Sequence, residues 1–159
     1  MPDVLIRQMT QAEFDDWRAA AIRSHADEQM AAGNWSPDEA EQLATEGHDA
    51  LLPGGFATPG MLFLAADDPE GDRVGILWLS ETHPRGIPDC GFLYDIEVAE
   101  PYRGSGYGRA LLTAAEDELR SRGVQSLGLN VFGDNTAAVR LYETSGYRVV
   151  TQQMLKSLT

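Results

Sequence analysis

The chain has 159 residues, of which 43% are hydrophobic, so it is long enough to form one well-packed core. Its 25 acidic residues exceed its 12 basic residues and leave a formal net charge of -13, which repels phosphate backbones and anionic lipid surfaces. Nucleic acid and membranes are therefore not expected as partners, and we expect a single domain over residues 1–159.

Only one cysteine, Cys90, is present, so the chain cannot form an intramolecular disulfide. No apolar run approaches the roughly 20 residues that cross a bilayer. The sequence MPDVLIRQMT lacks the basic and then apolar pattern of a secretion signal, and together these features favour a cytoplasmic location. Cys90 stands just before an apolar run, where a buried thiol is a better interpretation than a nucleophile.

The first 60 residues are predicted to form one short strand and two amphipathic helices. Val4–Arg7 fits a strand, and Thr10 with Glu13 forms a T-x-x-E capping box that should start the first helix. The second helix is expected to begin with a cap at Ser36 and to end at the Pro/Gly sequence 53–55.

Strands dominate from residue 61. The sequences MLFLAA, VGILWLS and GFLYDIEV have the spacing of an antiparallel meander, and Pro101 stops further pairing. The remaining predicted elements are a helix from about Arg109, a strand over Leu127–Val131, a helix over Asn135–Ser145 and a last strand over Tyr147–Lys156. The fold class is therefore α/β, with an antiparallel meander followed by a β-α-β crossover.

The stretch YDIEVAEPYRGSGYGRALL carries the most information about function. Gly104, Gly106 and Gly108 alternate in a turn that leads into a helix, so backbone N–H groups can converge with the positive end of the helix dipole. Such a turn can hold a pyrophosphate, and Arg103 adds a positive charge beside it. A P-loop would need a lysine after the glycines, and a dinucleotide fingerprint would need G-x-G-x-x-G directly after a strand. The sequence has neither.

Arg103 to Gly108 match R-x-x-G-x-G, and the whole stretch resembles the strand, pyrophosphate loop and helix of the GNAT N-acetyltransferase superfamily. A second stretch, LNVFGDNTAAVRLYETSGY, resembles the second CoA-binding segment of that family. The resemblance is specific over residues 92–147, whereas the first 60 residues match only in the order of elements. It implies a single-domain GNAT-like mixed sheet with helices on both faces, acetyl-CoA as acyl donor and no metal.

The resemblance also implies roles for individual residues. The end of the third strand of the meander would pair its backbone with the pantetheine arm, and the glycine-rich loop would hold the pyrophosphate. Asn135 would bind the pantetheine or phosphate side, and Tyr142 would lie beside the thioester sulfur. The predicted cofactor-binding residues are Ile96, Glu97, Val98, Arg103, Gly104, Ser105, Gly106, Tyr107, Gly108 and Asn135.

Helix geometry supports the pairing of Asn135 with Tyr142. The two residues are seven positions apart, so at about 100° per residue they are separated by roughly 700° and share one face of the helix. A phenol with a reference pKa near 10 is protonated at neutral pH and can donate a proton to a leaving thiolate. The alternative role for Tyr142 is an aromatic core anchor beside Leu141.

The sequence leaves the general base open. Regular alternation along GFLYDIEV puts one set of side chains on each face of the strand, Phe92, Tyr94 and Ile96 against Leu93, Asp95 and Glu97. GNAT relatives often carry glutamate or histidine at the positions of Phe92 and Tyr94, and this chain does not. We expect deprotonation relayed by water, with Tyr94 in the relay, or an acceptor that arrives neutral. Asp95 or Glu97 is an alternative base, or a hydrogen-bonded carboxylate at a strand end.

The expected reaction is direct attack of an amine, from a small molecule or a peptide, on the acyl thioester. Two alternatives remain open: a non-catalytic acyl-CoA-binding sensor, and an acetyltransferase acting on a protein N-terminus or lysine. Candidate walls of the acceptor site are Trp35, Phe56, Trp78 and Tyr94, each of which could equally be core. The tail QQMLKSLT is expected to supply the closing strand and is a candidate homodimer contact.

Overall fold

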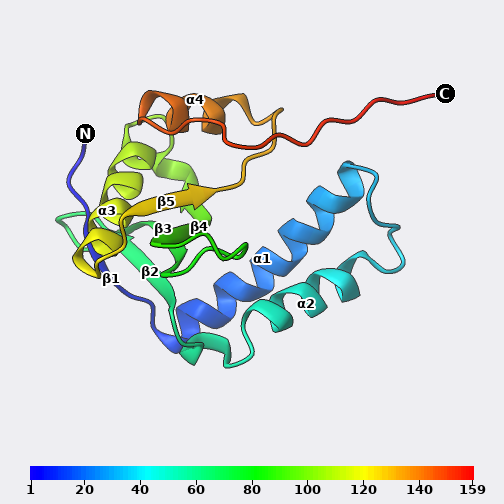
Figure 1. Ribbon diagram of the computed structural model, residues 1–159. Helices are drawn as coiled ribbons and strands as arrows, with labels where there is room; N and C mark the ends of the chain where they lie inside the picture. The colour runs from blue at the N-terminus through cyan, green and yellow to red at the C-terminus, as the bar shows by residue number, and fades with distance from the viewer.

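The computed structural model describes all 159 residues and contains one five-stranded sheet in the order β1-β2-β3-β4-β5. Helices cover both faces of this sheet (Figure 1). The elements in chain order are β1 (Leu5–Gln8), α1 (Gln11–Ala31), α2 (Ala40–Leu51), a 3-10 turn (Gly55–Ala57), β2 (Met61–Asp67), β3 (Arg73–Ser80), β4 (Cys90–Val98), a 3-10 turn (Glu100–Tyr102), α3 (Tyr107–Ser121), β5 (Ser126–Leu129) and α4 (Thr136–Thr144).

The sheet has the predicted topology. Strands β1 to β4 pair antiparallel in sequence order, and β5 pairs parallel to β4 after the crossover through α3. The meander followed by a β-α-β unit is therefore confirmed. No helix combines the length and the apolar character that a bilayer span requires.

The start of α1 follows the predicted capping box. The Thr10 hydroxyl accepts a hydrogen bond from the Glu13 N–H at 3.1 Å, and the Glu13 carboxylate accepts one from the Thr10 N–H at 2.9 Å. Glu13 also pairs with Arg7 of β1 at 2.7 Å, and Arg7 reaches Asp67 of β2 at the same distance. This network fixes the first turn of α1 against the sheet.

The second helix begins later than predicted. The Ala40 N–H does donate to the Ser36 carbonyl, but Glu39 has a φ of -120°, so the regular helix starts only at Ala40. From there α2 lies against α1 (Figure 1).

The two faces of the sheet carry different cores. On one face, Leu77 and Leu79 of β3 pack with Leu111, Leu112 and other residues of α3. On the opposite face, Phe14 and Trp17 of α1 pack against the sheet residues Phe63, Ile76 and Trp78. The sheet therefore separates an α1–α2 side from an α3–α4 side.

A bulge in β4 overturns the alternation expected for that strand. Trp78 of β3 lies opposite Asp95, but the next β3 residue, Leu79, lies opposite Leu93, so Tyr94 is an extra residue. Tyr94 packs against the core of the α1–α2 side, and Asp95 is bonded to α1, so these neighbours share one face. The prediction that Tyr94 and Asp95 point to opposite faces was wrong, because the pairing with β3 accommodates an additional residue.

The predicted last strand, Tyr147–Lys156, is not formed. No backbone hydrogen bond joins residues 148–159 to the sheet, and Val150, Met154 and Leu155 are 72%, 87% and 96% exposed. Figure 1 shows this tail running away from the sheet after α4. A strand needs a paired neighbour, and the sequence of a segment does not show whether one is available. The preceding strand is also shorter than predicted, since β5 ends at Leu129.

Gly75 of β3 marks the closest approach of α3 to the sheet. A Cβ atom there would lie 2.5 Å from the Glu97 carbonyl oxygen and would overlap Leu111. We expect Gly75→Ala to lower the free energy of unfolding by roughly 3 kcal/mol in urea titrations. Gly47→Ala is the control, because Gly47 lies in α2 with open space around it and should gain about 0.5–1 kcal/mol. Equal stability of the two variants would contradict this packing.

Candidate active site

The glycine-rich loop adopts the conformation that its sequence predicts. Gly104 and Gly106 have φ angles of 77° and 88°, a region that side-chain-bearing residues rarely occupy. Gly108 instead lies close to α4, since a Cβ atom there would lie 3.3 Å from Leu141 Cδ2. The helix after the loop begins at Tyr107, two residues before the predicted start, and Gly106 is its N-cap.

The loop leaves a run of backbone donors without partners. The first hydrogen bond of α3 joins the Ala110 N–H to the Gly106 carbonyl at 3.2 Å, and the N–H groups from Gly104 through Arg109 donate to no protein acceptor. Unpaired N–H groups at the start of a helix, aligned with its dipole, attract anions. The loop is therefore suited to a phosphate or pyrophosphate.

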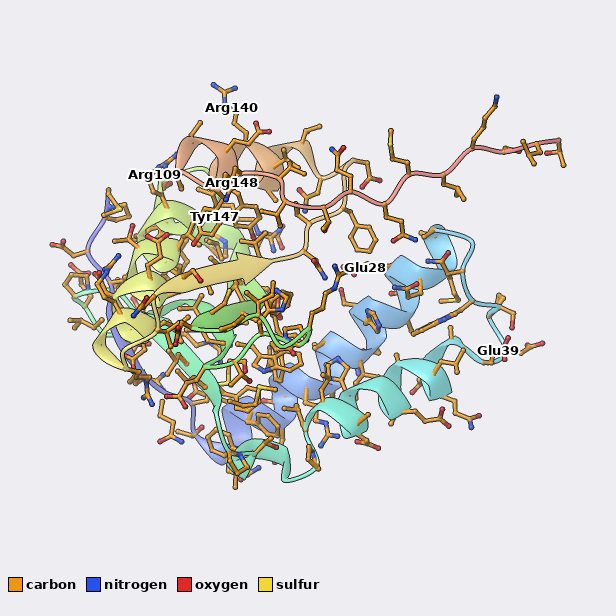
Figure 2. All side chains as sticks on the ribbon, viewed as in Figure 1. Glu28, Glu39, Arg109, Arg140, Tyr147 and Arg148 are labelled. Atoms are coloured by element: carbon orange, nitrogen blue, oxygen red, sulfur yellow. The ribbon has the colours of Figure 1, made fainter.

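Arginine side chains gather around this end of the molecule. Arg103 donates from Nε to the Val98 carbonyl at 3.0 Å, which ties the loop to the end of β4. Arg109 donates to Ser145 Oγ at 2.9 Å and to Thr144 Oγ1 at 2.7 Å, which joins α3 to α4. Figure 2 shows Arg109 and Arg140 on the α3–α4 side, whereas Glu28 lies on α1. Arg103 and Arg109 thus bring positive charge beside the loop of this acidic chain.

Strand β4 has an open edge next to the loop. β5 pairs only with Cys90–Leu93, so the edge of β4 that faces β5 has no strand partner from Tyr94 to Val98. Ile96, Glu97 and Val98, the residues predicted to pair with the pantetheine arm, lie in this unpaired stretch. An extended chain bearing amides could add to it as a strand does.

The two α4 residues of the predicted site, Asn135 and Tyr142, lie in different environments: Asn135 caps the helix and Tyr142 is in the core. Asn135 is the N-cap of α4, and its Oδ1 accepts from the Ala138 N–H at 3.2 Å, so the carboxamide already has a structural role. Tyr142 is 8% exposed in the core between the sheet and α3, and its hydroxyl has no hydrogen-bond partner in the protein. Burial, and then the charge of Asp95, raise the pKa of Tyr142, so the phenol stays protonated at neutral pH.

Asp95 is a half-buried carboxylate on the α1–α2 side of β4. Its Oδ2 accepts a hydrogen bond of 2.9 Å from Trp17 Nε1 of α1. Burial and the nearby charge of Glu97 raise the pKa of Asp95 to about 7, although the Trp17 hydrogen bond lowers it. A carboxylate that titrates near neutrality can accept a proton at neutral pH. Its residue type marked it as a candidate in the sequence, but only the bulge shows which face it occupies.

The predicted aromatic walls do not all lie together. Tyr94 stacks on Trp78 with their ring centroids 4.4 Å apart. Burial raises the pKa of the Tyr94 phenol. Trp35 contacts His25 at 5.2 Å within the α1–α2 pair. Phe56 instead stacks on Phe14, at 5.0 Å, near the beginning of α1.

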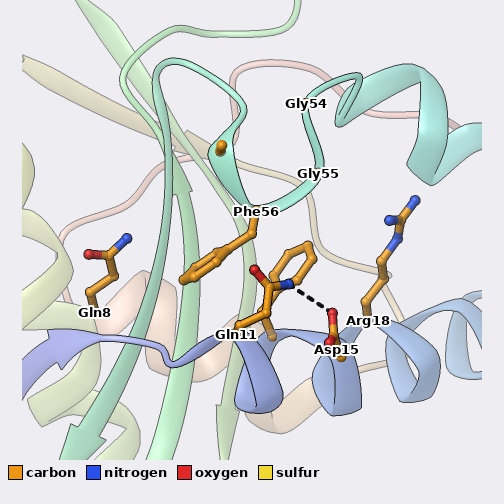
Figure 3. Close-up of a pocket in the computed structure, with 9 residues that line it drawn as sticks. Gln8, Gln11, Asp15, Arg18, Gly54, Gly55 and Phe56 are labelled. Atoms are coloured by element: carbon orange, nitrogen blue, oxygen red, sulfur yellow. Dashed lines mark hydrogen bonds between the residues drawn. The ribbon is translucent and has the colours of Figure 1, made fainter.

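Phe56 lines a separate cavity of about 390 Å³, shown in Figure 3. Gln11 donates to Asp15 at 3.0 Å there, and Arg18 forms an ion pair with Asp49 of α2. None of the predicted cofactor or catalytic residues borders this hollow.

Cys90 is buried, and its thiol lies 3.3 Å from the Gly91 carbonyl, which fits the structural interpretation of this residue. No cluster of three or more histidine, cysteine, aspartate or glutamate side chains is arranged to hold a metal ion.

The mixed sheet, the glycine-rich loop before α3 and the open edge of β4 together suit an anionic cofactor with an amide-bearing arm, and comparison with known families identifies the group. Over residues 11–147 the sequence matches the acetyltransferase (GNAT) family, so the chain belongs to that family. GNAT enzymes use acetyl-CoA as acyl donor.

The relatives include a protein of the same length and a longer enzyme. The chain is 34% identical to YycN of Bacillus subtilis (strain 168), an uncharacterized N-acetyltransferase, over 98% of this chain and 99% of YycN. The crystal structure of YycN matches with a TM-score of 0.91 over 99% of both chains. Mycothiol acetyltransferase of Rhodococcus erythropolis is 32% identical over 74% of this chain, which corresponds to 40% of that longer enzyme.

A more distant structure shares the fold. The PaiA N-acetyltransferase of Thermoplasma acidophilum, solved in complex with coenzyme A, has a TM-score of 0.65 at 20% identity and covers 95% of this chain and 93% of its own.

The raised pKa of Asp95 predicts a pH-dependent stability. The carboxyl group should ionise near pH 4 when unfolded and near pH 7 when folded, so its cost to folding grows between these values and is complete above pH 7. Asp95→Asn should therefore stabilise the protein by on the order of 2 kcal/mol at pH 8, with a gain that shrinks toward pH 5. Urea unfolding at several pH values measures this. Asp15→Asn, at an exposed position on α1, should show no such trend, and a pH-independent gain for Asp95→Asn would refute the assignment.

Proposed function

We propose that residues 1–159 form a single domain that transfers an acetyl or related acyl group from acyl-CoA to an amine. The observation that carries this proposal is the run of unpaired N–H groups from Gly104 to Arg109 beside the open edge of β4. One feature suits a pyrophosphate and the other an extended amide-bearing arm, and both chemical groups belong to CoA. The family membership of the chain agrees with this ligand.

The residues on this side fit CoA. The loop amides would hold the pyrophosphate, with Arg103 and Arg109 adding positive charge. The backbone of Ile96 to Val98 would orient the pantetheine amides, and the bound cofactor supplies the reactive thioester. Asn135 would contribute its NH2 group, since its Oδ1 is used in capping.

Two groups with suitable protonation states complete the proposal. Asp95 accepts the proton of the attacking amine, directly or through water with Tyr94 beside it. Tyr142 gives its proton to the departing sulfur as the carbon–nitrogen bond forms and the carbon–sulfur bond breaks. The charge of Asp95 contributes to the raised pKa of Tyr142, so the two groups lie within electrostatic range. Holding both reactants in one cleft supplies much of the remaining rate enhancement.

A small-molecule amine is the acceptor class that we favour. Mycothiol acetyltransferase, a relative at 32% identity, takes its name from a small molecule. The aromatic rings of Trp78 and Tyr94 next to Asp95 would provide an apolar wall around an amine.

The direct test is calorimetric titration with acetyl-CoA, followed by a free-thiol assay of the same preparation with a panel of amines. Binding followed by amine-dependent release of thiol supports the transferase. Binding without release for every small amine and peptide would favour an acyl-CoA sensor. Absence of binding would contradict the loop assignment.

Gly106→Val should weaken acetyl-CoA binding by at least about tenfold, since a side chain would both strain the loop and cover its amides. Gly123→Val is the matched control. Gly123 follows the other end of α3 with a φ of 81° and open space around it, so it suffers similar strain far from the loop. Calorimetry on both variants, with circular dichroism to confirm folding, measures the difference. Equal affinities of the two variants for acetyl-CoA would contradict the proposal that the glycine-rich loop holds the pyrophosphate.

Tyr142→Phe should lower kcat by about 10²-fold while leaving the affinity for acetyl-CoA almost unchanged, because only the proton donor is lost. The control is Tyr147→Phe, which removes a neighbouring hydroxyl that donates to Glu116 at 2.8 Å. Steady-state rates and calorimetry measure both effects. A wild-type rate for Tyr142→Phe would mean that another group, or none, protonates the sulfur.

A further inference from the structure

We propose that Trp17 is a positioning residue for Asp95, and that its indole N–H fixes the carboxylate and sets the pH at which it accepts a proton. This inference rests on the proposed function, in which Asp95 is the base. It adds a residue of α1, which is distant in sequence from the acyl-CoA segments, to the machinery of proton transfer. Trp17 is the only residue whose side chain hydrogen bonds to Asp95, at 2.9 Å.

The Trp17 ring is held on several sides. It is 6% exposed. Its centroid lies within about 6 Å of four other ring centroids, those of Phe14 (5.8 Å), Phe63 (5.4 Å), Trp78 (5.3 Å) and His48 (6.2 Å). A ring packed in this way has little freedom to rotate, so the direction of its N–H is fixed. The donor is therefore pre-organised by the core of the α1–α2 side.

The acceptor is fixed by the sheet. Asp95 follows the extra residue of the β4 bulge and lies opposite Trp78 of β3, a neighbour of Trp17. Without the bulge the carboxylate would point to the α3 side, where the indole could not reach it. Helix α1, in turn, is tied to β1 and β2 through Glu13, Arg7 and Asp67. Both partners thus belong to rigid parts of the structure.

Charged and titratable groups surround Asp95 from three elements. Glu97 of β4 and Glu28 of α1 carry like charges that oppose its ionisation, and Tyr142 of α4 is within electrostatic range. Tyr94 is its neighbour on β4. His48 of α2 contacts the Trp17 ring but forms no hydrogen bond with Asp95, and its Nδ1 is buried without a partner. Against burial and these carboxylates, the Trp17 N–H is the one side-chain hydrogen bond that favours the ionised form.

Nuclear magnetic resonance tests the coupling without any acceptor. The protein has three tryptophans, so its ¹H–¹⁵N spectrum contains three indole N–H signals, and the signal missing from Trp17→Phe is that of Trp17. In the wild type this signal should shift with a midpoint near pH 7, whereas in Asp95→Asn it should not shift with that midpoint. A Trp17 signal that stays constant between pH 5 and pH 9, or that titrates identically in Asp95→Asn, would overturn the proposal.

Kinetics test the consequence for proton transfer. With an amine identified by the thiol assay, the acidic limb of kcat/KM in Trp17→Phe should move upward by about one pH unit. Activity at pH 7 should then fall about fivefold and be regained near pH 9. Phe63→Leu is the control for the position of the limb, because Phe63 packs against the Trp17 ring but has no group that could bond to Asp95. A purely structural role for Trp17 would lower kcat/KM equally at every pH, and that result would contradict the proposal.

The outcomes separate the two proposals. If the wild type binds acetyl-CoA but acetylates no amine, the proposed function fails, and the role of Asp95 as base fails with it. If the wild type acetylates an amine and Asp95→Asn loses the acidic limb, but Trp17→Phe leaves that limb in place, only the role of Trp17 is wrong. A shifted limb together with a titrating indole signal supports both.

Discussion

One extra residue in β4 determines which side chains meet at the candidate active site. The bulge at Tyr94 lets β4 keep its pairing with β3 while Tyr94 and Asp95 both turn to the α1–α2 side. Pairing with β5 stops just before the bulge, so the opposite edge of β4 becomes free at the same point. The acceptor face and the cofactor edge therefore arise together, and Asp95 stands between them. Moving the bulge by one residue would separate the acceptor face from the cofactor edge of β4.

The parts of the site that depend on local chemistry could be predicted from the sequence. Alternating glycines before a helix indicate positive φ angles and free N–H groups, and the structure has positive φ angles at Gly104 and Gly106. The bulge could not be predicted, because it depends on the register with β3 and not on β4 alone. The bond between Trp17 and Asp95 joins residues 78 positions apart, and no sequence pattern signals it. A last strand was also predicted, but the chain after α4 finds no partner strand.

The distribution of charge explains how an acidic protein can belong to a family that uses an anionic cofactor. The net charge of -13 would repel CoA if it were spread evenly, but Arg103 and Arg109 lie at the loop and bond to groups around it. Helices α1 and α2 together carry eight acidic and two basic residues, whereas α3 and α4 together carry four acidic and three basic residues. The two faces of the sheet thus differ in charge as well as in packing, which is compatible with an anionic cofactor on one side and an amine on the other.

The contacts between α3 and α4 make the cofactor half of the molecule a mechanical unit. Gly108 allows α3 to approach Leu141, and Arg109 bonds to Thr144 and Ser145, so the loop is braced on both sides of Tyr142. The α1–α2 pair, by contrast, contributes nothing to this brace and contacts the sheet from the other face. Variation in the helix pair can therefore reshape the acceptor side while the loop and the phenol keep their relative positions. For protein engineering, this division marks the first 60 residues as the segment to exchange between relatives when a new acceptor is wanted.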